Sequence, residues 1–569
     1  RYLLNADGRA QVDVLITTLS FSSARLVLDE GPTRSTGLTL DAFGRLDIPV
    51  LQGIPVASSR RQWEESSLGL APQDAAMKVV LPEFDGRIIG VPIAFKEEAV
   101  GDAARLYVPD RERIRRLAGI AARQAHLRRT PNGDKRIALI LSNYPSKHAR
   151  IGNAVALDTP ASVVNILQAL REAGYAADGF PEDGDQLVHN LIDRCGQDPE
   201  FVTAEQMREA VGHVPVESYR GWFARLPAPV QTAMQQAWGA PPGNVLRFGD
   251  TLVIPGLRYG NIFVGVQPTR GFGENPVAIY HSPDLPPTHQ YIAFYGWLRE
   301  IFQADAIVHV GKHGNLEWLP GKALALSEAC YPDLTLGDLP LIYPFVINDP
   351  GEGTQAKRRA HAVIVDHLIP IMTTADTYNE LAKLEQLMDE YVRVQTLDPT
   401  KLPVLEAQIW QLIEETRMDQ DMHVSERPND FAVFLQHVDG YLCELKDSQI
   451  RDGLHTLGRV PEGDDRINLL LALTRLDNGA IPSLRRAIAE GMGLPYEGLL
   501  QNRGQPVGAV GEAALPPIVH RFADGQALRT QGDLLEAVDR AARTLLQAFD
   551  RELYQAEAID RVIAEVFDT

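Results

Sequence analysis

Histidines gather in one stretch of this sequence. Of the 14 histidines, six lie between residues 281 and 367. A single histidine is usually a core or surface residue with satisfied hydrogen bonds, but imidazoles that cluster on loops at the ends of strands favour a functional site. This stretch is therefore the strongest candidate for chemistry in the chain. The six residues are His281, His289, His309, His313, His361 and His367.

His313 and Glu317 form the most suggestive pair within this stretch, because they are four residues apart. One helical turn after Gly311 would place the imidazole and the carboxylate on the same face. Such a pair could hold a borderline divalent cation, since imidazole and carboxylate suit cobalt, zinc or iron. It could equally relay protons, with one neutral base and one acid of adjustable pKa. The spacing alone leaves both roles open.

A second group of polar residues occupies positions 348–359. Asp349, Glu352 and the glycines beside them form an acidic turn, and three cations follow on an expected helix. Consecutive helical residues do not share a face, so at most two of these cations can point at one ligand. They are either a solvated helix end or a clamp for carboxylates, for which the arginine fork is geometrically suited. The cations are Lys357, Arg358 and Arg359.

Motifs of several other enzyme classes are missing from the sequence. Residues 314–322 superficially resemble a phosphate-binding loop, but six residues separate the two glycines where four are required, and Ala323 replaces the Ser or Thr. The sequence also lacks an HExxH zinc motif, a GxGxxG dinucleotide loop and a GxSxG nucleophile elbow. If ATP drives the chemistry, we expect another chain to hydrolyse it.

The elements that must position these residues alternate between strand and helix. Such alternation predicts parallel sheets, whose ligands collect at the carboxyl ends of the strands. The loops 309–317 and 348–359 should therefore lie on one rim, together with the loop 142–159. Strands are expected at 12–16, 48–51, 87–92, 136–141, 304–310, 341–347 and 362–365, and helices at 72–80, 110–129, 160–173, 288–301 and from 354, with Thr159 as the N-cap of the third.

The expected fold class is α/β, with several parallel-sheet, flavodoxin-like units followed by a mainly helical region. A chain of 569 residues is too long for a single hydrophobic core. The expected parts are an α/β domain at 1–104, a second α/β unit with a connecting helix at 105–215, a central α/β domain with both polar loops at 216–377, and the helical region at 378–569.

Composition narrows the classes of protein further. The net charge of −20 argues against a nucleic-acid partner, because phosphate binding needs a basic surface. The three cysteines, Cys195, Cys330 and Cys443, form no CxxC pair, so any metal chemistry should use histidines and carboxylates. No apolar run approaches the ~20 residues of a membrane span, and no signal peptide opens the sequence. We therefore expect a soluble, cytoplasmic protein.

Several strings of this sequence are long enough to be recognised. The two longest run from Gly311 to Lys322 and from Asn348 to Arg359, and shorter ones lie at 74–87, 142–145 and 151–160. They closely resemble the signature of the CobN/magnesium chelatase large-subunit family. Trp318 and the Pro-Gly-Glu-Gly-Thr-Gln string at 350–355 resemble the aerobic cobaltochelatase branch, since magnesium members carry phenylalanine and a Pro-Ser-Glu-Ala form there.

The resemblance implies ATP-dependent insertion of Co(II), the substrate metal, into hydrogenobyrinic acid a,c-diamide, a corrin-type tetrapyrrole, during cobalamin biosynthesis. The chain would then belong to a ligase that forms nitrogen–metal bonds. ATP and Mg(II) would be bound by AAA+ ATPase partner subunits and not by this chain. Two alternatives remain open: a magnesium chelatase large subunit that acts on protoporphyrin IX, and a non-catalytic tetrapyrrole-binding protein. Family members are longer than this chain, so we expect a central fragment.

We expect the ring to lie across the loops 142–159, 258–274, 309–322 and 348–359. His313 and Glu317 would bind and deliver the cobalt and accept the two pyrrolic protons, with His309 as a supporting residue or further ligand. Trp297, Trp318, Tyr343 and Phe345 could offer flat walls, although aromatic residues at strand ends more often belong to the core. The residues expected to bind the ring are Lys147, Arg150, Asn153, Arg258, Arg270, Trp318, Lys322, Glu352, Lys357 and Arg358.

Overall fold

The computed structural model divides the chain into two compact units. Unit 1 comprises Arg1–Ile369, His455–Val460 and Thr474–Thr569, and unit 2 comprises Pro370–Leu454 and Pro461–Leu473. The finer division into four parts expected from the sequence stays a prediction. The structure describes residues 3–28, 36–39, 43–98, 105–143, 157–194, 202–271, 282–370, 398–416, 454–501 and 531–567, together with shorter pieces between these ranges.

Unit 1 contains a six-stranded sheet with the strand order β11-β12-β7-β13-β14-β15. Neighbouring strands from β12 to β15 pair in parallel, and β11 is antiparallel to β12. All five residues of β7 are buried, as expected for an apolar strand that is covered on both faces. The strands are β7 (Ile137–Leu141), β11 (Leu257–Tyr259), β12 (Ile262–Val266), β13 (Ala306–Val310), β14 (Leu341–Val346) and β15 (Val363–His367).

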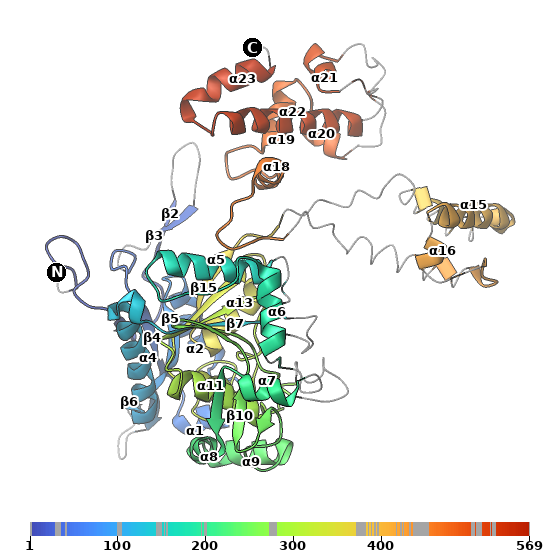
Figure 1. Cartoon of the computed structure of the whole chain (residues 1–569). Helices are drawn as coiled ribbons and strands as arrows, with labels where there is room; N and C mark the ends of the chain where they lie inside the picture. The colour runs from blue at the N-terminus through green and yellow to red at the C-terminus, as the bar shows by residue number, and fades with distance from the viewer. Residues whose placement is uncertain are drawn as a thin grey trace. The chain divides into compact units, whose positions relative to one another are not determined.

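Helices cover both faces of this sheet (Figure 1). Alternate residues of β7 point to opposite faces: Leu139 packs with the helices of one layer, and Ile140 packs with those of the other. The first layer contains α5 (Thr159–Glu172) and α6 (Gly184–Arg194), and the second contains α11 (His289–Glu300), α12 (Tyr331–Leu336) and α13 (Pro350–Arg359). The predicted α/β class, with helices that alternate with parallel strands, is therefore confirmed.

The N-terminus of α5 differs from the sequence expectation by one residue. Asp158, and not Thr159, is the N-cap, because its carboxylate accepts a hydrogen bond of 3.0 Å from the backbone N–H of Ala161. A carboxylate reaches the free N–H groups of the first turn as well as a threonine hydroxyl does. Thr159 and Pro160 are then the first two helical residues.

A second sheet lies in the N-terminal part of unit 1, with the order β1-β4-β5-β6. The first three strands of this sheet pair in parallel, and β6 is antiparallel to β5. The sheet extends past the domain boundary expected at residue 104. Its elements are β1 (Leu15–Thr17), β4 (Val50–Val56), α1 (Arg60–Glu65), α2 (Pro72–Ala75), α3 (Leu81–Glu83), β5 (Ile88–Glu98), β6 (Arg105–Pro109) and α4 (Arg111–Arg129), with a π-helix at Ala76–Val80.

The remaining elements include a small antiparallel sheet of order β8-β10-β9, which the sequence patterns did not predict. A two-stranded hairpin pairs β2 with β3. From residue 378 the described elements are helical, as predicted. The elements are β2 (Arg25–Leu28), β3 (Thr36–Thr39), α7 (Ala204–Glu209), β8 (Gly212–Pro215), α8 (Val216–Ala224), α9 (Ala228–Trp238), β9 (Arg247–Phe248), β10 (Thr251–Ile254), α15 (Leu402–Glu415), α18 (Gly463–Leu473), α19 (Leu484–Gly491), α20 (Tyr496–Gln501), α21 (Pro517–Arg521), α22 (Gln531–Arg551) and α23 (Ile559–Phe567).

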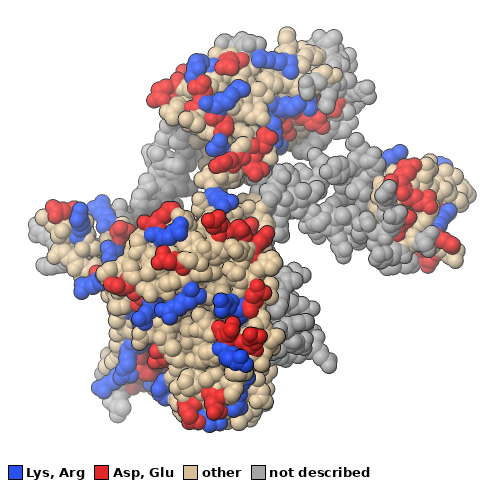
Figure 2. Space-filling view, viewed as in Figure 1, with Lys and Arg blue, Asp and Glu red and all other residues tan. Residues whose placement is uncertain are grey.

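Charged side chains are distributed over the described surface. On the face drawn in Figure 2, basic and acidic residues are interspersed. Within the described residues, no helix is both long and apolar enough to cross a membrane.

Candidate active site

The loop that follows β13 carries His313 and Glu317 and contains no helix. Around these two residues the chain makes a turn at 315–319, where the N–H of Trp318 donates to the carbonyl of Asn315 over 3.3 Å. The helical turn expected after Gly311 is therefore wrong. Gly311 itself has φ of +137°, and a Cβ there would lie 2.1 Å from the Ser142 hydroxyl, so this position requires glycine. The close approach packs the loop after β13 against the loop after β7.

The topology explains why a ligand should bind at this edge. The chain passes from β7 to α5 on one face of the sheet, whereas β12 and β13 are followed by helices on the other face. Ligands of open α/β sheets bind at the carboxyl ends of strands where the connections change face. The loops after β13 and β14 emerge from adjacent parallel strands, so both polar groups lie on one rim, as the sequence predicted.

Glu317, Tyr343 and His309 form the buried part of the site. The Glu317 side chain belongs to a residue only 1% exposed, and its Oε1 accepts a hydrogen bond of 2.6 Å from the Tyr343 hydroxyl. The same hydroxyl accepts a hydrogen bond of 2.6 Å from the backbone N–H of Gly314. The Tyr343 ring stacks on His309 at a centroid distance of 4.8 Å. One phenol side chain therefore holds two residues of the loop, Gly314 and Glu317, against His309 of β13.

His309 is neutral in this arrangement. Its Nε2 lies 2.9 Å from the carbonyl oxygen of Lys312, which can only accept, so Nε2 carries the proton and donates it. Burial lowers the pKa of His309, and the nearby Glu317 carboxylate offsets this in part. Burial also raises the pKa of Tyr343, which remains a hydroxyl donor.

A buried network of amide and phenol side chains holds the loop after β13 in place. Gln267 accepts from the backbone N–H of Asn315 over 3.0 Å and donates to the Tyr295 hydroxyl over 3.0 Å. The Tyr291 hydroxyl donates to the Asn315 side-chain oxygen over 2.6 Å. Burial raises the pKa of Tyr295 to about 12, and that of Tyr291 also lies well above its usual value. The network is therefore uncharged and fixes the loop between Gly314 and Glu317.

His313 and Glu352 form the more exposed part of the site. The Nε2 of His313 lies 3.9 Å from Oε1 of Glu352, and the two side chains are 19% and 36% exposed. The Nδ1–H of His313 donates to the Gly314 carbonyl over 2.8 Å, which leaves Nε2 as the basic nitrogen. Trp318 meets the His313 ring edge to face at 5.7 Å. The loop after β13 thus contacts the first turn of α13, a helix that begins at Pro350 and not at 354 as expected from the sequence.

The carboxyl group of Glu352 has a raised pKa, so it is a weaker acid than an ordinary glutamate. Burial raises the pKa of Glu352, and the neighbouring Asp349 carboxylate raises it further, whereas His313 lowers it. Within the described residues, no three His, Cys, Asp or Glu side chains are placed to hold one metal ion. The site contains two imidazoles and two carboxylates that interact electrostatically. The carboxylate within ion-pair distance of His313 is that of Glu352, whereas the sequence spacing indicated Glu317.

Two arginines of α13 hold backbone and side-chain groups of this chain. Arg359 donates to the carbonyls of Glu317, Leu319 and Lys322 over 2.6, 2.9 and 3.1 Å, and so ties α13 to the first polar loop. Arg358 pairs with both oxygens of Glu83 in α3 over 3.0 and 2.7 Å. The sequence offered no signal for these partners, because they lie far along the chain.

Lys322, predicted to bind the ring, reaches into the N-terminal part of unit 1 instead. Its ammonium donates to the carbonyls of Trp63, Glu64 and Ser66 over 2.7, 3.0 and 2.7 Å, at the end of α1. The ammonium also lies 5.1 Å from the centre of the Trp63 ring. These contacts account for all three donors of the lysine.

Two other predicted ring-binding arginines lie away from the rim or beneath it. Arg270 is 0% exposed and donates to the carbonyls of Trp318 and Leu285 over 3.2 and 3.1 Å, and also to that of Ser282. Burial lowers the pKa of Arg270 to about 10. Arg258 lies on the edge strand β11, which β12 and β7 separate from β13, so it is away from the loop that carries His313.

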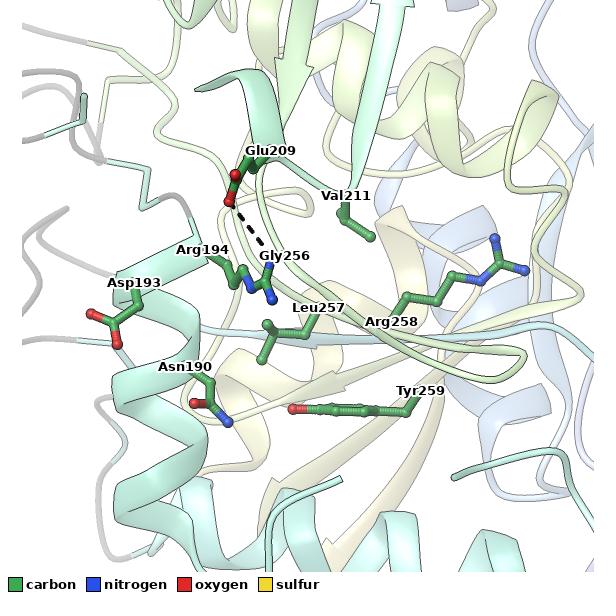
Figure 3. A pocket seen from close by; sticks show the side chains of 9 residues that line it. All are labelled: Asn190, Asp193, Arg194, Glu209, Val211, Gly256, Leu257, Arg258 and Tyr259. Atoms are coloured by element: carbon green, nitrogen blue, oxygen red, sulfur yellow. Dashed lines mark ion pairs between the residues drawn. The ribbon is translucent and has the colours of Figure 1, made fainter. Parts of the chain in front are cut away.

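Arg258 lines a separate cavity of about 460 Å³ beside the edge strand β11 (Figure 3). Arg194 and Glu209 form an ion pair across it at 3.8 Å, and the Arg258 side chain extends away from this pair. The full lining consists of Asn190, Asp193, Arg194, Glu209, Val211, Gly256, Leu257, Arg258 and Tyr259.

The remaining predicted residues have mixed outcomes. Lys147, Arg150, Asn153 and His281 lie outside the described residues. Lys357 is half-buried on α13, and Trp318 is half-buried beside His313. The expectation that Trp297, Tyr343 and Phe345 offer walls to a ligand is wrong, because these residues are 5%, 1% and 3% exposed and belong to the core.

The architecture matches a solved structure along nearly the whole chain. The catalytic subunit of cobaltochelatase from Mycobacterium tuberculosis is 44% identical and gives a TM-score of 0.69, over 97% of this chain and 44% of that chain. The fold and the rim site therefore define an α/β protein of the chelatase type.

Sequence comparison identifies the family. The model of the CobN/Magnesium Chelatase family matches residues 1–567. Aerobic cobaltochelatase subunit CobN of Pseudomonas aeruginosa is 44% identical over 510 residues, which are 88% of this chain and 40% of that protein. Magnesium-chelatase subunit ChlH of Oryza sativa subsp. indica is 30% identical over 528 residues, 90% of this chain and 36% of that protein. The chain belongs to the CobN/magnesium chelatase family and spans about 40% of its cobaltochelatase relative.

The tight packing around Gly314 generates a first prediction. A Cβ at this position would lie 3.1 Å from His309 Cε1 and 3.2 Å from both Gln267 Nε2 and Glu317 Oε2. We expect Gly314→Ala to lower the free energy of unfolding by about 1–3 kcal/mol, measured by urea unfolding, because the loop must shift. Gly351→Ala is the matched control, since nothing lies within 4 Å of its added methyl group. Equal stabilities of the two variants would contradict the described packing.

The contacts of Lys322 generate a second prediction. Lys322→Met should lower the free energy of unfolding by about 2–3 kcal/mol, because three carbonyls lose a charged donor. Lys401→Met, which alters a lysine 69% exposed, should change it by less than about 0.5 kcal/mol. Thermal unfolding of the two variants provides the comparison. A Lys322→Met protein of unchanged stability that binds the macrocycle weakly would instead favour the ring-binding role predicted from the sequence.

Proposed function

We propose that this chain is the tetrapyrrole-binding, metal-inserting part of an ATP-dependent cobaltochelatase large subunit. The reaction is the insertion of Co(II) into hydrogenobyrinic acid a,c-diamide in cobalamin biosynthesis. The observation that carries the proposal is the pairing of His313 with Glu352 at 3.9 Å on the rim, with Glu317 and His309 buried behind them. Membership of the CobN/magnesium chelatase family supports the same reaction class.

The two parts of the site suit the two demands of metal insertion. A hydrated cation must lose water and pass to the ring, while two pyrrolic N–H protons leave. The partly exposed His313 and Glu352 offer an imidazole nitrogen and a carboxylate, which suit a borderline cation such as Co(II). The raised pKa of Glu352 also makes it a stronger proton acceptor near neutral pH.

Glu317 supplies the second carboxylate in this proposal. It is 1% exposed, so it cannot meet a hydrated ion without rearrangement, but it lies beside the loop that the ring would cover. We assign it the stabilisation of positive charge that collects at the rim, and the assignment of Glu317 as a direct metal ligand remains the alternative. His309, neutral and hydrogen-bonded, supports this arrangement from behind.

The Trp318 ring, which is half-buried beside His313, offers a flat surface to the macrocycle. Lys357 of α13 remains a candidate for the polar groups at the ring edge. Lys147, Arg150 and Asn153, which lie outside the described residues, stay candidates on the strength of the sequence alone. We do not assign ring binding to the other four predicted cations. Arg258 lies on β11, and the other three donate hydrogen bonds to groups of this chain: Arg270, Lys322 and Arg358.

ATP hydrolysis is assigned to AAA+ partner subunits, which would bind the ATP and Mg(II). This assignment is supported by the lack of a phosphate loop in the sequence. Cobalt is preferred over magnesium because CobN of Sinorhizobium sp is 43% identical to this chain, whereas the magnesium-chelatase subunit of rice is 30% identical. Trp318 also favours cobalt, because a tryptophan at this position resembles the aerobic cobaltochelatase branch.

The experiment uses the full-length protein with its partner ATPases, ATP and Co(II). We expect His313→Ala and Glu352→Gln each to slow cobalt insertion by at least about 100-fold, because each removes a metal ligand or proton acceptor. Glu209→Gln is the control, since this carboxylate lines the cavity beside β11, which β12 and β7 separate from β13. Insertion is followed by the absorption change of the corrin.

Three outcomes would contradict the proposal in different ways. Normal insertion by the His313→Ala protein would remove this residue from the mechanism. Insertion of Mg(II) into protoporphyrin IX, with no cobalt insertion, would assign the chain to the magnesium branch. Tight macrocycle binding without insertion of either metal would identify a non-catalytic binding protein.

A further inference from the structure

The Tyr343 hydroxyl occupies a special place in the site. It lies on β14, whereas the two groups that it joins lie on the loop after β13: the backbone N–H of Gly314 and the Glu317 carboxylate, each at 2.6 Å. Among the described residues, Tyr343 is the donor to this carboxylate. A carboxylate that is 1% exposed depends on such a donor, because water cannot replace it.

We propose that Tyr343 is the positioning residue of the site, which sets the direction of the Glu317 carboxylate and the turn at Gly314 with one oxygen atom. This inference rests on the proposed metal insertion. Tyr343 is buried, so we assign it no direct contact with the metal or the macrocycle; it acts through Glu317. The Arg359 side chain fixes the backbone carbonyl of the same glutamate over 2.6 Å, so the main chain and the carboxylate are held by two different elements.

The substitution Tyr343→Phe separates this role from simple packing. It keeps the ring that stacks on His309 at 4.8 Å, and it removes only the oxygen. The Gly314 N–H then loses its acceptor, and the Glu317 carboxylate loses its donor. Loss of a residue that orients a metal-site group typically costs roughly 10–100-fold in activity or metal affinity, so we expect metal insertion to slow by that factor.

Tyr219→Phe provides a matched control. Tyr219 is 0% exposed, and its hydroxyl lies 2.7 Å from Nδ1 of His289, so its loss also removes a buried hydrogen bond from the core of unit 1. The two variants should lose similar stability, but only Tyr343→Phe should slow metal insertion per folded molecule. The affinity for the macrocycle should stay unchanged in both, so that the effect falls on kcat and not on KM.

A double-mutant cycle with Glu317→Gln tests whether Tyr343 acts through the glutamate. Full-length wild type, Tyr343→Phe, Glu317→Gln and the double variant are assayed for insertion with their partner ATPases, and macrocycle binding is followed by tryptophan fluorescence. We expect Tyr343→Phe to slow insertion much less in the Glu317→Gln protein than in the wild type, because only the contact of the hydroxyl with the Gly314 N–H remains to be lost there.

The outcomes separate this inference from the proposed function. A wild-type protein that inserts no metal overturns the proposed function and the inference together. If the wild type inserts metal, the inference alone is overturned by a Tyr343→Phe protein with normal kcat, or by effects of the two substitutions that multiply in the double variant. A fall in stability with normal insertion per folded molecule would reduce Tyr343 to a core residue.

Discussion

Parallel pairing of β7, β13 and β14 is the constraint on which the site depends. Because adjacent parallel strands end on the same edge, the loops that follow them must meet there. Gly311 allows the loops after β7 and β13 to approach closely, since any side chain at this position would collide with Ser142. Arg359 then returns from α13 to bind the carbonyls of the first loop. The arrangement of imidazoles and carboxylates follows from these contacts and not from local helical spacing.

The site has an inner and an outer layer with different physical properties. Glu352 and His313 are partly exposed, whereas Glu317 and His309 are nearly excluded from solvent. Burial favours neutral forms, which explains the lowered pKa of His309 and the raised pKa of Glu352. A cation that approached the rim would meet ligands at the surface and a compensating negative charge behind them. This order of charges suits a metal that is passed on and not retained.

The sequence predicted what depends on local patterns. The apolar runs of β7 and β13, the helix α11 and the two polar loops all follow from short-range composition. The pairings within the site do not. Tyr343 meets Glu317 across 26 residues, Arg359 meets the same residue across 42, and Lys322 meets Trp63 across 259. Lysine and arginine in a signature loop suggested ligand binding, but several of these side chains satisfy buried carbonyls of the chain itself.

The most direct test of the proposed site is to locate where the macrocycle binds. Hydrogen–deuterium exchange of the full-length protein, with and without the tetrapyrrole, measures it. We expect the ring to protect backbone amides in 311–319 and 347–356, at the carboxyl ends of β13 and β14. Protection confined to 190–211 and 256–260, around the cavity beside the edge strand β11, would contradict it.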